Sequence, residues 1–180
     1  TPDEFRSQLS HINEMINGFG IKHFELEGFE ADDIIAALAK RAESEGFEVL
    51  ICTGDRDSFQ LINETTTVLY PKRGVTDLAR MTPEAVLEKY GLTPAQYPDF
   101  AALRGDPSDN LPSIPGVGEK TAVKLLNQFQ SLEGVLENRD GIKNMHAISN
   151  TLFLCFIFKF LSRISFASFM FSIFSILAEG

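Results

Sequence analysis

The sequence has few of the residues that build disulfide frameworks or zinc sites. Its only cysteines, Cys52 and Cys155, are far apart and lack the close spacing of metal ligands, so neither a disulfide scaffold nor a zinc site is predicted. The three histidines, at positions 11, 23 and 146, are scattered and receive no chemical role. Residues 1–10 lack the basic and apolar segments of a secretion signal. We therefore expect a protein of a reducing cytoplasm.

Basic residues are outnumbered by acidic ones. The 16 Lys and Arg against 25 Asp and Glu give a formal net charge of −9. A uniformly acidic surface would bind nucleic acid poorly, since contacts to phosphates depend on Lys and Arg. Clustered carboxylates that hold divalent cations reverse this expectation, because the bound ions present positive charge to a phosphodiester. The positions of the acids therefore matter more than their number.

Charged side chains nearly disappear after residue 143, where only Lys159, Arg163 and Glu179 remain. Residues 151–178 are rich in Phe and Ser and contain no Gly or Pro. This stretch is long enough to cross a bilayer, which needs about 20 apolar residues, but charges and serines interrupt it. The alternative is a non-native C-terminus, such as out-of-frame translation, and we favour this reading over a membrane segment.

Apolar periodicity outlines the structure of residues 1–143. Helices are predicted over 5–19, 31–45 and 119–129, with two more that open at Thr82-Pro83 and Thr93-Pro94. Strands are predicted over 21–26, 47–52 and 66–70, and the continuous apolar run at 47–52 is typical of a parallel strand buried on both faces. Strand, helix, strand in that order predicts a right-handed crossover. The expected class is α/β followed by a small helical module.

Two acidic motifs are candidates for metal binding, and the second of them directly follows a predicted strand. Glu30, Asp32 and Asp33 precede an apolar helical run; the structural alternative is that they stabilise the positive end of the helix dipole. Asp55 and Asp57 directly follow the predicted strand at 47–52, and ligands of such sheets bind outside the carboxyl ends of strands. For Asp57 the alternative is a solvated turn in which it caps a short helix.

The third motif joins two acids, Asp106 and Asp109, to a glycine-containing hairpin. Gly116 and Gly118 flank Val117 at a predicted helix start, where backbone N–H groups can approach a phosphate without interference from a Cβ atom. Cationic side chains follow directly. We predict sequence-independent contacts to the DNA backbone from Gly116, Gly118, Lys120 and Lys124.

The three motifs together supply the carboxylates Glu30, Asp32, Asp33, Asp55, Asp57, Asp106 and Asp109. Hard oxygen ligands without His or Cys favour Mg²⁺ or Mn²⁺ over zinc. Bound ions would also relieve the mutual repulsion of the acids. The predicted chemistry is phosphodiester hydrolysis assisted by two or more divalent ions.

The segments FEADDIIAALA, TGDRDSFQL and GDPSDNLPSIPGVGEKTA resemble, in order and spacing, the motifs of the 5′ nuclease domain of bacterial DNA polymerase I. This family is also called the flap endonuclease family. The resemblance runs from about residue 1 to about residue 143. It implies a PIN-like parallel-sheet nuclease core over 1–100 and a helix-hairpin-helix DNA-binding module over 101–143, followed by an unrelated tail over 144–180.

The resemblance also implies an activity and site residues. Family members remove RNA primers and 5′ flaps from flapped or nicked duplex DNA during replication and repair in the bacterial cytoplasm. The acids that match the family's catalytic metal site are Glu30, Asp32, Asp33, Asp55, Asp57 and Asp109, with Asp106 close to them. The positions that match a monovalent-cation site, with K⁺ as the expected ion, are Leu103, Arg104, Pro112, Ile114 and Val117.

Part of the family pattern is expected to lie outside this chain. A first strand with a metal-site Asp, a further acidic position and a basic arch would precede Thr1, so we expect an incomplete sheet and an incomplete metal site. A polymerase domain is expected in the intact parent protein. Three alternatives remain: a non-catalytic DNA-binding remnant that uses the hairpin, a topoisomerase-primase type fold, and a membrane-anchored protein.

Overall fold

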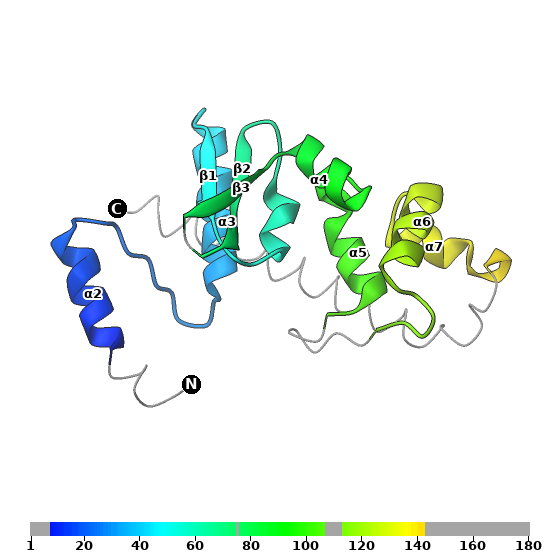
Figure 1. Ribbon diagram of the computed structural model, residues 1–180, viewed down its shortest axis with the longest axis horizontal. Helices are drawn as coiled ribbons and strands as arrows, with labels where there is room; N and C mark the ends of the chain where they lie inside the picture. The colour runs from blue at the N-terminus through cyan, green and yellow to red at the C-terminus, as the bar shows by residue number, and fades with distance from the viewer. Residues whose placement is uncertain (1–7, 75, 107–112, 143–180) are drawn as a thin grey trace. The chain divides into compact units, whose positions relative to one another are not determined.

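The computed structural model describes residues 8–74, 76–106 and 113–142, and the chain divides into two units, residues 1–34 and 35–180. Figure 1 shows the elements along the chain. Their bounds are α2 Leu9–Gly18, α3 Ala31–Ser44, β1 Val49–Cys52, η1 Asp57–Leu61, β2 Thr66–Arg73, β3 Asp77–Met81, α4 Pro83–Tyr90, η2 Pro94–Gln96, α5 Tyr97–Arg104, α6 Glu119–Phe129, α7 Leu132–Glu137 and η3 Arg139–Gly141.

The first unit contains α2 and the start of α3. The helix predicted over residues 5–19 is present as α2 within the described residues. The strand predicted over residues 21–26 is wrong, because this segment has no regular structure. The segment contains Ile21, Phe24 and Leu26, but a strand also needs a neighbour to share its backbone hydrogen bonds. Ile21 and Phe24 remain more than half exposed, at 58% and 52%.

The second unit contains a three-stranded sheet in the order β1-β2-β3. β1 runs parallel to β2, from the pair Val49/Thr66 to the pair Cys52/Leu69, whereas β3 runs antiparallel to β2. The sheet is therefore mixed. Since residues 21–26 form no strand, the expected crossover around α3 is absent from the described residues. β1 is also not buried on both faces, because it lies at the sheet edge and Leu50 is 57% exposed.

A hydrogen-bonded cluster ties α3 to the start of β2. The Glu43 carboxylate accepts hydrogen bonds from the Thr66 hydroxyl and from Asn63 Nδ2, and its second oxygen lies 3.6 Å from Lys40 Nζ. Burial acts to raise the pKa of Glu43, but the two hydrogen bonds and the Lys40 charge outweigh it, so the pKa lies below its ordinary value. These bonds satisfy the polar groups at the point where β2 begins.

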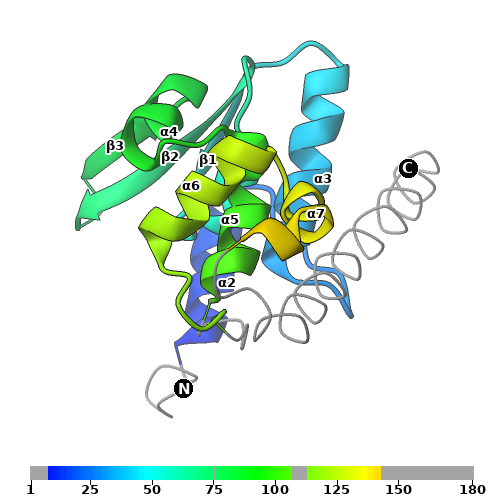
Figure 2. The ribbon, with the colours of Figure 1, turned by 90° about the vertical axis from the view of Figure 1, so that its right-hand side faces the viewer.

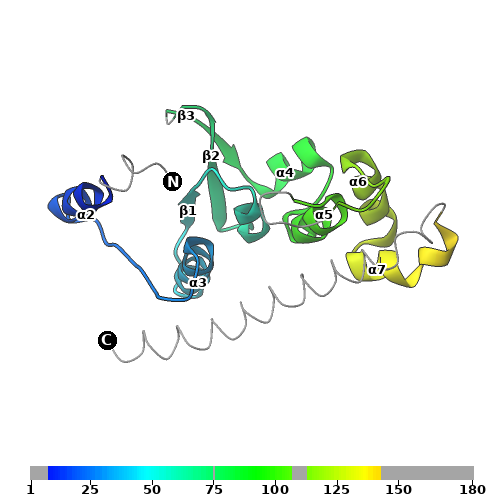
Figure 3. The same ribbon diagram turned by 90° about the horizontal axis from the view of Figure 1, so that it is seen from below.

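Within the described residues the α-helices α4 to α7 follow the sheet, and proline and threonine set where the first ones begin. Thr82 caps α4 by accepting a hydrogen bond from Ala85 N, with Pro83 in the first turn. Thr93 and Gln96 form a capping box at η2, from which α5 continues. α6 has the predicted bounds. Figure 2 shows α4 alongside β3, and α6 beside α5. In Figure 3, α6 and α7 lie to the right of α4 and α5, on the side away from the sheet.

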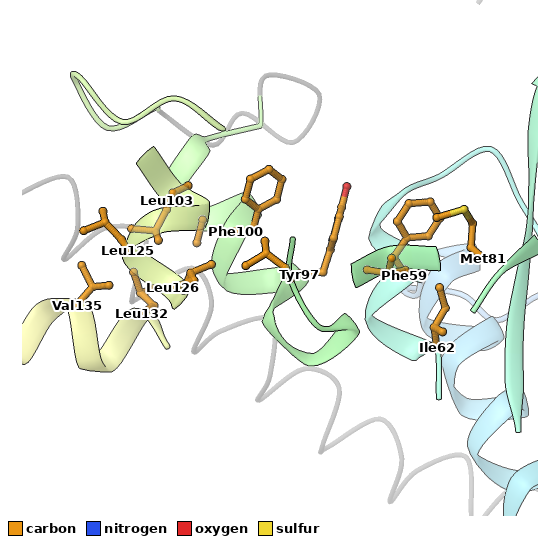
Figure 4. Close-up of a cluster of buried hydrophobic side chains, with 14 of the residues drawn as sticks. Phe59, Ile62, Met81, Tyr97, Phe100, Leu103, Leu125, Leu126, Leu132 and Val135 are labelled. Atoms are coloured by element: carbon orange, nitrogen blue, oxygen red, sulfur yellow. The ribbon is translucent and has the colours of Figure 1, made fainter. Parts of the chain in front are cut away.

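One apolar core joins the sheet to the helices of the second unit. Phe59 is fully buried, and its ring lies 5.5 Å from that of Tyr70 and 5.4 Å from that of Tyr97. Tyr97 lies between Phe59 and Phe100 (Figure 4). The core continues to Leu126 and other residues of α6 and α7. The expectation of an α/β core followed by a helical module is confirmed.

The Phe- and Ser-rich segment lies outside the described residues, as do Asp109 and Pro112. Among the helices that the structure describes, none has the length and apolarity that crossing a bilayer requires.

Candidate active site and DNA-binding hairpin

The turn after β1 is held in shape by its own side chains. Thr53 N donates to Leu69 O across the sheet, at 3.3 Å. Asp55 N then donates to Thr53 Oγ1 at 3.0 Å, and Asp57 N donates to Asp55 Oδ1 at 2.9 Å. η1 begins at Asp57. The alternative in which Asp57 caps the short helix is wrong, because Arg56 is the N-cap residue, without a side-chain cap, and Asp57 is the first residue of η1.

An open pocket of about 530 Å³ lies at this turn. It combines residues from the end of β1, from β2 and from the end of α5, so it brings together the second and third acidic motifs. Its three carboxylates face two guanidinium groups and a tyrosine. The lining residues are Gly54, Asp55, Arg56, Asp57, Tyr70, Arg104 and Asp106.

The two arginines of the pocket are both fixed by neighbours. Arg104 Nη2 lies 2.9 Å from Asp106 Oδ2, and its Nη1 lies 3.5 Å from Glu119 Oε1 at the start of α6. Arg56 Nε donates to the Tyr70 hydroxyl at 3.3 Å, which raises the pKa of Arg56 above its ordinary value. Both groups therefore carry a positive charge inside the pocket, where an anion such as a phosphate would meet them.

The structure brings Asp55, Asp57 and Asp106 to one pocket. Glu30, Asp32 and Asp33 belong to the first unit, where Glu30 N donates to Asp33 Oδ2 at 3.2 Å in the first turn of α3. Over residues 8–74, 76–106 and 113–142, no three His, Cys, Asp or Glu side chains are arranged to hold a metal ion. The carboxylate oxygens of the pocket fit Mg²⁺ or Mn²⁺, whereas its described acids are not arranged as a closed metal site.

The hairpin before α6 is a turn anchored by two apolar side chains. Ile114 and Val117 are 1% and 6% exposed, and Val117 N donates to Ile114 O at 2.9 Å. Gly116 between them has φ +82°, a left-handed conformation that favours glycine. Gly118 precedes the first residue of α6, and the first N–H groups of a helix have no acceptor within it. Lys120 and Lys124 are exposed one turn apart.

The residues that matched a monovalent-cation site fall into two groups. Ile114 and Val117 are in the turn just described, while the Leu103 side chain is fully buried in the core. The Arg104 side chain pairs with Asp106 and Glu119, a role that the motif comparison did not indicate. The cation site itself remains a prediction.

Three pocket residues were not predicted as site residues from the sequence. Gly54 and Arg56 lie within the second motif, and Tyr70 lies in β2. These positions follow from the rule that ligands gather at the carboxyl ends of parallel strands, because β1 and β2 are parallel. Applying that rule to the strand predicted over 66–70 would have found Tyr70.

Comparison with protein families gives two adjoining matches. Residues 1–91 match the 5′-3′ exonuclease N-terminal resolvase-like domain, and residues 92–167 match the 5′-3′ exonuclease C-terminal SAM fold. The chain belongs to the 5′-3′ exonuclease family that is part of bacterial DNA polymerase I. The topoisomerase-primase alternative is therefore wrong.

Curated relatives agree with this family. The chain is 59% identical over 143 residues to DNA polymerase I of Mycobacterium bovis, a match that covers 79% of this chain and 16% of the relative. With DNA polymerase I of Streptococcus pneumoniae it shares 49% identity over 152 residues, covering 84% and 17% of the two chains. The chain thus spans about a sixth of the length of these relatives.

Solved structures share the fold at low sequence identity. A mutant of the bacteriophage T5 5′-exonuclease has a TM-score of 0.74 at 18% identity, with 96% of this chain and 76% of that chain covered. A T5 flap endonuclease in a pseudo-enzyme-product complex with DNA and metal ions has a TM-score of 0.74 at 16% identity, with 98% and 72% covered.

Proposed function

We propose that this chain contributes to a divalent-metal-dependent 5′-3′ exonuclease and 5′-flap endonuclease that acts on DNA. The observation that carries this proposal is the pocket at the end of β1, because it joins acids from two motifs that are distant in the sequence. Asp55, Asp57 and Asp106 share it with Arg56 and Arg104. Acids and cations together suit a site that must hold both a metal ion and a phosphate.

The residues of the chain have separate roles in this proposal. Asp55, Asp57 and Asp106 would hold divalent ions, and the family resemblance gives the same role to Asp109, Glu30, Asp32 and Asp33. The ions, Mg²⁺ or Mn²⁺, supply activation of water and charge stabilisation at the phosphodiester. Arg56 and Arg104 neutralise and orient the phosphate, and the Tyr70 hydroxyl, which accepts from Arg56, retains its own proton for donation.

In this proposal the hairpin and α6 bind the DNA duplex, while the pocket receives the phosphodiester that is cut. Gly116 and Gly118 let a phosphate approach the backbone N–H groups, and Lys120 and Lys124 add charge, so binding is independent of sequence. The substrate is a 5′-flapped or nicked duplex, as in Okazaki primer removal and repair. A polymerase domain in a longer parent protein is the natural partner, since the matched relatives are DNA polymerases I.

The test is cleavage of a labelled 5′-flap duplex, with Mg²⁺ and with chelator, by the chain extended with the first strand and metal-site Asp that the family resemblance implies ahead of Thr1. We expect this extended chain to cleave only when Mg²⁺ is present, and its Asp55→Asn variant not to cleave. Asn retains the oxygen that accepts from Asp57 N, so this variant should melt at the same temperature as the wild type, or higher, without metal because repulsion among the acids falls. Undiminished cleavage by Asp55→Asn would contradict the proposal.

A second function is favoured by the hairpin, because its anchored turn and the exposed Lys120 and Lys124 do not depend on the acids of the pocket. In this alternative the chain binds duplex DNA through the hairpin and does not cut it. The same experiment separates the two functions, because this alternative requires duplex binding without cleavage in any divalent metal.

A further inference from the structure

A second open pocket is lined by residues of the helices α4, α5 and α6. Its volume is about 320 Å³, and it takes residues from the end of α4 and from the first turns of α6. The lining residues are Lys89, Tyr90, Phe100, Glu119, Lys120 and Val123. Only Lys120 among them belongs to the predicted DNA-binding set.

The two lysines of this pocket come from helices whose spacing is fixed. Gly91, which ends α4 with φ +69°, packs so closely on α6 that a Cβ atom there would lie 3.3 Å from Val123 Cγ1. Asn127 Nδ2 also donates to Gly91 O at 3.2 Å. These contacts hold the last turn of α4 against α6. Lys89 and Lys120 are therefore two cations on one packed surface, although they are far apart in the sequence.

The charges of the pocket favour an anion. Lys89 Nζ lies 5.3 Å from the ring centre of Tyr90 and 5.6 Å from that of Tyr70. A cation over a ring face is positioned without using its hydrogen-bond donors. Glu119 is the one acid in the lining, and Arg104 already lies 3.5 Å from its carboxylate. Lys89 and Lys120 both remain exposed.

We propose that Lys89 and Lys120 together bind the phosphodiester backbone of duplex DNA in this pocket. DNA is the expected ligand of this pocket because Lys120 also belongs to the hairpin surface that holds DNA in the proposed function, so the two surfaces are continuous. The inference rests on that function and extends the DNA path from α6 onto α4. The alternative for Lys89 is a stabilising role at the C-terminal end of α4, where a cation suits the helix dipole.

The experiment measures how the affinity of the full chain for a labelled blunt duplex depends on salt, with two unrelated sequences. Lys89→Met keeps the apolar stem over the tyrosines but removes the charge. Losing one phosphate contact should lower the slope of log affinity against log salt by about 0.9, for both sequences. Lys89→Arg should retain the wild-type slope. Lys72→Met, at an exposed lysine of β2, is the control for loss of general charge.

The outcomes separate this inference from the proposed function. If Lys89→Met leaves the salt slope unchanged, the proposed role of Lys89 is overturned, even where Lys120→Met lowers the slope. The same holds if Lys72→Met lowers the slope as much as Lys89→Met does. A wild-type chain that does not bind duplex would overturn the hairpin function as well. A helix-stabilising role would lower the melting temperature of Lys89→Met without changing the slope, and circular dichroism of each variant measures this. Lys89→Gln, a second neutral variant, should lower the salt slope by the same amount as Lys89→Met, and an unchanged slope in this variant would contradict the proposal.

Discussion

The hairpin and the carboxylate pocket of the second unit are built in different ways. The hairpin and the first turns of α6 come from one continuous segment, residues 113–124, and two buried side chains, Ile114 and Val117, anchor it. The pocket instead takes residues from the end of β1, from β2 and from the end of α5, and Asp55 within it is exposed. The proposed DNA-binding hairpin is therefore formed by a continuous segment of the sequence, whereas the proposed catalytic pocket depends on how distant segments pack together.

The two regions nevertheless share one core. Phe59 lies two residues after Asp57 of the pocket, and its ring contacts Tyr97 at the start of α5. Arg104 also links them, since it pairs with Asp106 in the pocket and with Glu119 in α6. The two regions are therefore separable in chemistry but not in folding.

The largest expected effect is that of removing the shared core. Phe59→Ala should reduce the free energy of unfolding by about 3–5 kcal/mol, because Phe59 is fully buried and a cavity would remain. Denaturant titration followed by circular dichroism measures this. DNA binding and any Mg²⁺ effect on melting should be lost together. Two separate unfolding transitions, one for each region, would show that the regions fold independently.

An intermediate effect is expected from a matched pair of glycines in the hairpin. Gly116→Ala forces a Cβ atom into a left-handed conformation and should cost about 1–2 kcal/mol. Gly118 has φ −92°, and no atom lies within 4 Å of an added Cβ, so Gly118→Ala should change stability by less than about 0.5 kcal/mol.

DNA affinity should fall in both glycine variants, because a methyl group would keep the phosphate from the backbone N–H groups. Thermal melting and duplex titration of the two variants check the pair. Equal stability losses at the two positions would contradict the described turn, and unchanged DNA affinity in both would remove the hairpin from the DNA path.

The smallest expected effect is that of one exposed cation. Lys120→Ala should leave melting nearly unchanged and lower the salt slope of duplex binding by roughly one unit, equally for all sequences. Titration of two unrelated duplexes over a range of salt concentrations measures this. A loss confined to one sequence would mean that α6 reads bases and would contradict backbone contact.

Much of the helical module could be predicted from the sequence, because its signals are local. Threonine followed by proline marks the starts of α4 and η2, and Gly118 precedes α6 at the predicted residue. The strand predicted over residues 21–26 failed because strands depend on neighbours that a local pattern does not reveal. β3, over Asp77–Met81, was missed for the same reason, since its pairing with β2 gives it its structure.

The candidate site could be predicted only in part. The position of Asp55 and Asp57 after β1 follows from the sheet rule, and the structure brings Asp106 to the same pocket. The pairing of Arg104 with Asp106 and Glu119 could not be foreseen, because it depends on how α5 and α6 pack. Motif spacing gives the order of residues along the chain but not the neighbours that the fold supplies.

The most direct test of the central claim, that holding DNA and cutting it use separate surfaces, is duplex affinity in chelator. The chains to compare are wild type, Asp55→Asn with Asp57→Asn, and Lys120→Ala. Removing two negative charges should leave affinity unchanged or raise it, since like charge repels phosphate. Lys120→Ala should bind more weakly at low salt. A folded double-asparagine variant that loses duplex binding without metal would contradict the claim.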